Sequence, residues 1–248
     1  LCARSGAGLW MSRTEWLLGR TLKTDDMDAY RRALDAHLVD CGADDESRAA
    51  ILEAGSKYPD RVSSIPRRYT RIAGGMDLTI GGRRFRCIEG RGHAPEHIGF
   101  YCPAEKLYLT GDQVLPKISP NVSVWQTEPE GDPLNEFLDC LDENAKLPED
   151  LTALPSHGRP FRAFRARVAQ LKAHHKERLD EAQDDLRRAG PKTAWAATRT
   201  MFPRPLDPHR MWFALGETLA HLNLLIAWDF VERRPGEGPE GADLYAAK

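Results

Sequence analysis

The segment Gly90-Arg-Gly-His-Ala-Pro-Glu-His97 decides the fold of this chain. It follows Arg83 to Ile88, where the hydrophobic pattern changes to a period of two and predicts a strand. Two other polar segments also follow predicted strands, Tyr108-Leu-Thr-Gly-Asp112 and Leu154-Pro-Ser-His-Gly158. Because a rigid scaffold presents functional groups on such loops, the three segments are the leading candidates for functional residues.

The side chains in these segments are those that bind divalent metals. Two histidines and one carboxylate are suitable ligands for zinc or a similar ion. Each segment alone also has a structural interpretation. A histidine after a strand is more often a hydrogen-bonded structural residue, and Thr110-Gly-Asp112 is also typical of a turn.

Taken together and in this order, the three segments resemble the metallo-β-lactamase superfamily, near its glyoxalase II-like and RNase-like hydrolases. The spacing matches as well, with about 19 residues from His93 to Asp112 and about 45 more to His157. The resemblance covers residues 1 to about 165. It implies an α/β fold, half of a four-layer αββα sandwich with a metal centre along one edge of the two sheets.

The resemblance also implies roles for individual residues. His93 would bind a first metal, Asp112 would bridge two metals, and His157 would bind the second. His97 and Ser156 would lie in the shell behind these ligands, although a core-facing position for His97 is equally open. A metal lowers the pKa of bound water, so such a site would activate water at neutral pH.

One segment of the family pattern is absent. The His-x-His-x-Asp-His signature should precede Leu1, and the only histidine before residue 90 is His37. Two zinc or other divalent ions are therefore expected in a complete protein, and one or none in this chain. Either the parent protein continues upstream, or the chain is a degenerate form without hydrolytic function. Apolar surface left uncovered by a missing half-sheet would favour a homodimer.

The remaining pattern divides the chain near residue 165, into a domain over 1–165 and a helical, winged-helix-like domain over 166–248. Two amphipathic helices between residues 24 and 58 form either a solvated cover or a lid over a site. Hairpins are expected at 77–88 and 98–110, and a helix over 132–147 precedes a strand over 151–154. Further helices are expected at 163–189, 192–201 and 208–228. In the loop 118–125, Asn121 and Trp125 are candidates for a substrate pocket, although Trp125 could simply pack.

Composition bounds the class of protein. Hydrophobic residues make up 41% and charged residues 29% of 248 residues, which excludes a disordered chain, a collagen and a coiled coil. No apolar run approaches the roughly 18 residues of a membrane helix. Five scattered cysteines without a CxxC pair indicate reduced thiols and a cytoplasmic location.

The leading hypothesis is a metal-dependent hydrolase of a small-molecule ester or thioester. A second is a non-catalytic scaffold, and a third is a nucleic-acid-binding or RNA-cleaving protein. Net charge is only −2, yet eleven Lys and Arg face five Asp and Glu between Arg159 and Arg199. In that segment His174 and His175 are expected to be exposed to solvent.

Overall fold

The computed structural model describes residues 2–55 and 58–248 and divides them into two compact units. The sheet unit comprises Leu1–Thr24, Tyr58–Pro120 and Glu136–Lys172, and the helical unit comprises Asp25–Lys57, Asn121–Asn135 and Ala173–Lys248. Both units are discontinuous in sequence, which differs from the expected division into 1–165 and 166–248. Hydrophobic periodicity reports local structure only, so it did not reveal that residues 25–55 and 121–135 belong with the C-terminal helices.

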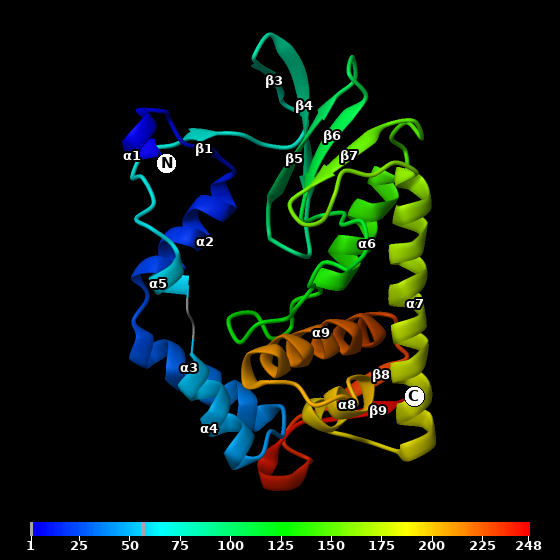
Figure 1. The fold of residues 1–248 in the computed structure, drawn as a ribbon. Helices are drawn as coiled ribbons and strands as arrows, with labels where there is room; N and C mark the ends of the chain where they lie inside the picture. Colours follow the sequence, from blue (N-terminus) through cyan, green and yellow to red (C-terminus); the bar gives the residue numbers. More distant parts are fainter. Residues whose placement is uncertain (1, 56–57) are drawn as a thin grey trace. The chain divides into compact units, whose positions relative to one another are not determined.

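The sheet unit is built on five strands in the order β3-β4-β5-β6-β7 (Figure 1). They are β3 (Asp77–Ile80), β4 (Arg83–Gly90), β5 (His97–Cys102), β6 (Leu107–Gly111) and β7 (Thr152–Pro155). Neighbours are antiparallel except β6 and β7, which are parallel. The predicted hairpins are confirmed. Gly81 and Gly82 turn between β3 and β4 with φ of 56° and 76°, as a two-residue turn requires.

The two faces of this sheet differ in burial. Tyr101, Tyr108 and Ala153 form one row across the strands, and Tyr108 packs edge-on against Phe164 at the start of α7 (Phe164–Ala189). On the opposite face Phe100 and Leu109 are cross-strand partners, and 38% of Leu109 is exposed. The start of α7 therefore covers one face, while the other presents apolar side chains to solvent.

Short elements complete the sheet unit. They are α1 (Cys2–Ser5), β1 (Trp10–Met11), α2 (Arg13–Thr24), α5 (Tyr58–Arg61), β2 (Thr70–Arg71) and most of α6 (Pro133–Asn144). β1 pairs with β2 in parallel. The Trp16 ring of α2 stacks on Tyr69 at 4.7 Å between centroids.

The helical unit contains α3 (Met27–Asp40), α4 (Asp45–Ala54), the C-terminal part of α7, α8 (Ala194–Met201) and α9 (Pro208–Ala227). Its hairpin joins β8 (Val231–Arg234) to β9 (Leu244–Ala247), with a 3-10 turn, η1, at Pro239–Gly241 between them. Asp207 caps α9 by accepting a hydrogen bond from the Arg210 N–H. α9 is the core helix, with Leu215, Leu222 and Leu224 fully buried.

Packing corrects the expected exposure of His175 and gives the helices of residues 24–58 a place in the core. His175 is only 1% exposed, because α7 turns this position toward α9, where its Nδ1 lies 3.3 Å from Nε2 of His221. The two helices of residues 24–58 contribute Leu34, Leu38 and Ile51 to the core of the helical unit. Their role as a lid stays a prediction.

Among the described residues, no helix combines the length and apolar character needed to cross a membrane. All five cysteines are free thiols.

Candidate functional site

Strand direction places the three candidate segments at one edge of the sheet. β5 is antiparallel to both β4 and β6, so β4 and β6 point the same way, and β7 runs parallel to β6. The C-terminal ends of β4, β6 and β7 therefore meet at one edge. The segments that follow them carry His93, Asp112 and His157.

At this edge the Asp112 carboxylate lies between two imidazoles. Nε2 of His93 is 3.8 Å from Oδ2 of Asp112, and Nε2 of His157 is 3.5 Å from Oδ1. The side chains of His93 and Asp112 are 28% and 31% exposed, and that of His157 is 69% exposed. Each imidazole thus approaches a different oxygen of the same carboxylate, in a site open to solvent.

The donor chemistry at this edge fits a divalent metal. Oδ1 of Asp112 is buried and, within the described residues, has no hydrogen-bond partner. A buried carboxylate oxygen without a donor is costly unless a cation approaches it. The ligand shell is nevertheless incomplete. In residues 2–55 and 58–248, no group of three or more His, Cys, Asp or Glu side chains is placed to hold a metal ion.

His97 lies immediately behind this carboxylate, at the start of β5. Its Nε2 packs so closely on Gly111 that a Cβ built there would lie 2.1 Å away, and Gly111 has a φ of +56°. Burial lowers the pKa of His97 to about 4, helped by the nearby His93 and opposed by Asp112. His97 is therefore a neutral imidazole that packs under the Gly111–Asp112 turn. Its role in the shell behind the ligands stays a prediction.

Glu96 anchors the loop that carries His93, a role the sequence did not indicate. Its carboxylate accepts a hydrogen bond from the Thr14 N–H at 2.7 Å, its carbonyl accepts one from the Ser12 hydroxyl at 2.6 Å, and its N–H donates to Glu15 at 3.1 Å. Burial opposes ionisation, but the Thr14 hydrogen bonds hold the pKa of Glu96 below its usual value. These partners are more than 80 residues away in sequence, so no local pattern could have revealed them.

Arg167 is a second functional candidate that sequence reasoning missed. Its guanidinium donates to the Leu115 carbonyl at 2.6 Å and to the Ile118 carbonyl at 2.8 Å. These contacts fix the loop that forms one wall of a cavity of about 500 Å³. The opposite wall begins with His157, so the cavity adjoins the candidate site.

The other predicted site residues lie in different places. Ser156 is exposed, and its N–H donates to the Gly111 carbonyl at 3.1 Å, which holds the segment before His157 against β6. Asn121 and Trp125 belong to the helical unit, where the Trp125 ring lies 5.4 Å from that of Trp212. There Asn121 accepts a hydrogen bond from the Ser123 hydroxyl at 3.0 Å. Trp125 thus packs against other aromatic rings, and a role in substrate binding stays a prediction for both residues.

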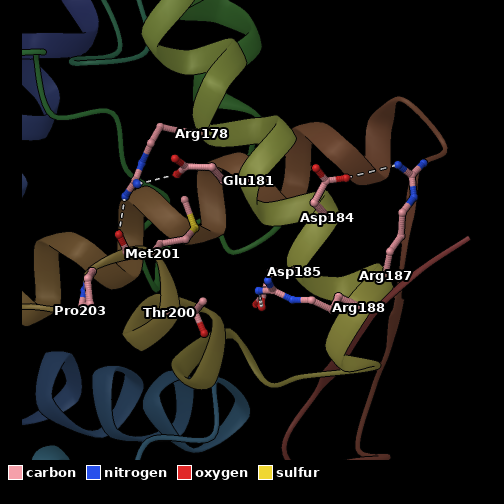
Figure 2. A pocket seen from close by; sticks show the side chains of 9 residues that line it. All are labelled: Arg178, Glu181, Asp184, Asp185, Arg187, Arg188, Thr200, Met201 and Pro203. Atoms are coloured by element: carbon pink, nitrogen blue, oxygen red, sulfur yellow. Dashed lines mark hydrogen bonds and ion pairs between the residues drawn. The ribbon is translucent and has the colours of Figure 1, made fainter.

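The basic segment of α7 lines a larger cavity of about 770 Å³ within the helical unit (Figure 2). Its arginines are paired with acids one turn away: Arg178 with Glu181 at 2.8 Å, Arg187 with Asp184 at 3.7 Å, and Arg188 with Asp185 at 3.4 Å. Lys192 also reaches Asp185, at 2.6 Å. Much of the positive charge counted in the sequence is therefore locally compensated.

Comparisons with known proteins agree with this architecture. The sequence model of the metallo-beta-lactamase superfamily matches residues 13–157, and that of a metallo-beta-lactamase-like C-terminal domain matches residues 179–245. A beta-lactamase domain protein from Burkholderia ambifaria is 38% identical with a TM-score of 0.86, over 98% of this chain and 67% of that one. A metallo-beta-lactamase family protein from Thermus thermophilus is 32% identical with a TM-score of 0.78, over 98% of this chain and 72% of that one. With its α/β fold and mixed sheet, this chain belongs to the metallo-beta-lactamase superfamily.

Proposed function

We propose that the protein is a metal-dependent hydrolase of esters, thioesters or related bonds, with its site at the edge formed by β4, β6 and β7. The observation that carries this proposal is the position of Asp112, which has one imidazole near each carboxylate oxygen. A carboxylate flanked by two imidazoles in this way could hold a divalent metal together with them. Members of the superfamily generally bind metals such as zinc or iron.

His93, Asp112 and His157 would hold the metal. When bound, the metal would supply a water of lowered pKa that can act as a nucleophile near neutral pH. The two imidazoles are neutral donors, so they add no negative charge that would weaken attraction for a carbonyl or phosphoryl oxygen. Glu96 holds the loop before β5, and Gly111 allows His97 to pack beneath the carboxylate.

We further propose low metal occupancy for this chain. Two imidazoles and one carboxylate are fewer ligands than a two-metal site requires. We therefore expect at most one zinc ion per chain, bound weakly, together with negligible turnover of a generic thioester. The full pair of metals would be expected only in a protein that also supplies the remaining ligands.

A zinc titration tests the proposal directly. The full chain is stripped with a chelator and titrated with Zn²⁺ by calorimetry, and the bound metal is then measured by elemental analysis. Asp112→Asn should weaken zinc binding by about 10-fold or more, since loss of even a residue that only orients a metal ligand costs about 10- to 100-fold. His209→Ala, which removes an exposed histidine of the helical unit, should leave it unchanged.

One result would contradict the assignment of Asp112 as a metal ligand, and another would contradict the proposed low metal occupancy. Zinc affinity that is identical in the native chain and in Asp112→Asn would remove Asp112 from the site. Two tightly bound equivalents, or thioester turnover at rates typical of enzymes, would show that the chain already supplies a complete shell.

The second candidate function is nucleic-acid binding by the helical unit, with or without RNA cleavage. It is favoured by the succession of α8, α9 and the β8–β9 hairpin, which suits a winged-helix-like module. It requires binding that weakens steeply with salt and disappears when Arg187, Arg188 and Lys192 are neutralised. Binding that ignores both changes would rule it out and leave at most a scaffold role.

The free thiols support the further proposal that the protein works in a reducing compartment such as the cytoplasm.

A further inference from the structure

The cavity of about 500 Å³ beside His157 has the size of a small-molecule site. It lies wholly within the sheet unit, between residues 116–118 and residues 157–161. His157 is shared between the cavity lining and the candidate metal site. Whatever fills the cavity therefore lies next to the group that we propose as a metal ligand.

The lining of this cavity includes exposed apolar surface. Ile118 is 61% exposed, the largest exposed fraction among the large hydrophobic side chains of the described residues. Phe161 forms the facing wall, where its backbone pairs with Ala153 and its ring stacks 6.3 Å from Phe164. A ligand with an aryl or alkyl group would remove this apolar surface from water.

The walls are also held in place before any ligand arrives. Arg167 binds the carbonyls of Leu115 and Ile118, as described above. Gly158 approaches Pro116 so closely that a Cβ at this glycine would lie 2.7 Å from the proline ring. A cavity with fixed walls binds a ligand with little loss of conformational freedom of its own.

The polar part of the lining carries one sign of charge. Lys117 and Arg159 both line the cavity, and no acidic side chain of the described residues does. Among the ion pairs of the described residues, neither cation takes part. The charges that line the cavity in the helical unit are balanced instead, because each of its arginines has an acidic partner (Figure 2). Two uncompensated cations beside apolar walls favour an anion with an apolar body.

We propose that this cavity binds the non-reacting part of the substrate, and that this part is an aryl or alkyl group bearing a carboxylate. The inference rests on the proposed hydrolase function and narrows it to carboxylate-bearing esters or thioesters. Ile118 and Phe161 contact the apolar group, and Lys117 and Arg159 bind the carboxylate. The scissile bond then lies toward His157.

Two matched probes test the inference on the full, metal-free chain. 4-Phenylbutyrate carries the apolar group and the carboxylate, and 4-phenylbutan-1-ol carries the same apolar group without charge. Binding is measured by calorimetry and ligand-observed NMR at pH 7 and low salt. We expect the carboxylate to bind about 5- to 10-fold more tightly, which is the range for two exposed cation–anion contacts.

Variants assign the effect to the cavity. Lys117→Met with Arg159→Met should reduce the preference for the carboxylate to about 2-fold or less, because the charge is lost while most of the side-chain length is kept. Ile118→Ser should weaken both probes equally. Arg86→Met, an exposed arginine on β4 outside the cavity, should change neither.

Asp112→Asn separates this inference from the proposed function. Probe binding that survives in Asp112→Asn while zinc binding is lost supports both proposals. Unchanged zinc affinity in that variant, with probe preference intact, would overturn the metal site and leave the cavity. Equal affinity for both probes, no saturable phenylbutyrate binding, or an equal effect of Arg86→Met would overturn the cavity inference whatever the zinc result.

Discussion

Gly111→Ala should destabilise the sheet unit strongly, because the substitution combines two separate costs. The backbone has a φ of +56°, where a residue with a Cβ costs about 1–2 kcal/mol. The new Cβ would also lie 2.1 Å from Nε2 of His97, so the imidazole must move, at about 1–3 kcal/mol for overpacking. The expected loss in the free energy of unfolding is therefore about 2–5 kcal/mol.

Amide hydrogen exchange in β5 and β6 measures this loss, because it reports on the sheet unit itself. Gly75→Ala is the matched control, since Gly75 has a φ of +80° and nothing within 4 Å of a Cβ. It should lose only the backbone part, about 1–2 kcal/mol. In a His97→Ala background the clash is absent, so Gly111→Ala should cost no more than the control does.

The reasoning would be refuted by either of two outcomes. One is a loss in Gly111→Ala that equals the loss in Gly75→Ala. The other is a loss that stays the same when His97 is removed. Both would mean that the contact between Gly111 and His97 contributes nothing to the stability of the site.

Two further predictions concern the buried histidines and the exposed face of the sheet. Burial lowers the pKa of His175 to about 3 and that of His221 to about 4. Between about pH 4 and 6.5 these histidines therefore bind more protons in the unfolded chain than in the folded one, so the free energy of unfolding rises with pH. Acidification from pH 7 to about 4.5 should destabilise the helical unit by on the order of 2–3 kcal/mol for each of these two histidines. His175→Gln with His221→Gln should reduce this slope and leave the part due to His37, whose pKa burial also lowers to about 4. Burial raises the pKa of Glu217, which makes the free energy of unfolding fall with pH, opposite to the effect of the histidines. Glu217 is present in both the variant and the native chain, so the difference between them reports the two histidines alone. A pH dependence that is the same in both would contradict the assignment to His175 and His221. The exposed row containing Phe100 and Leu109 should promote pairing of two chains, and Leu109→Lys should shift a dimer toward monomer in light scattering. A native chain that is monomeric at about 100 µM, well above the micromolar range of weak self-association, would disprove this pairing.

Local sequence determined most of the secondary structure and the turns. The Gly81-Gly82 dipeptide selects a two-residue turn because only glycine adopts positive φ at both positions without strain. The helices at 27–40, 45–54, 164–189, 194–201 and 208–227 follow from apolar spacing, capping residues and breaks that are all local. The polar segments after three strands carry His93, Asp112 and His157, and the resemblance of the three segments to the metallo-β-lactamase superfamily singled these residues out.

Only the tertiary structure decided how these side chains meet and what supports them. The antiparallel and parallel pairings of β4 to β7 bring three strand ends to one edge, and they set which oxygen of Asp112 faces which histidine. The hydrogen bond from Thr14 to Glu96 and the burial of His175 against His221 depend on segments 82 and 46 residues apart. Hydrophobic period and capping describe one element at a time. The pairing of distant elements is set by which packing of the whole chain buries its apolar faces and satisfies its polar groups, and that is a property of the assembled fold.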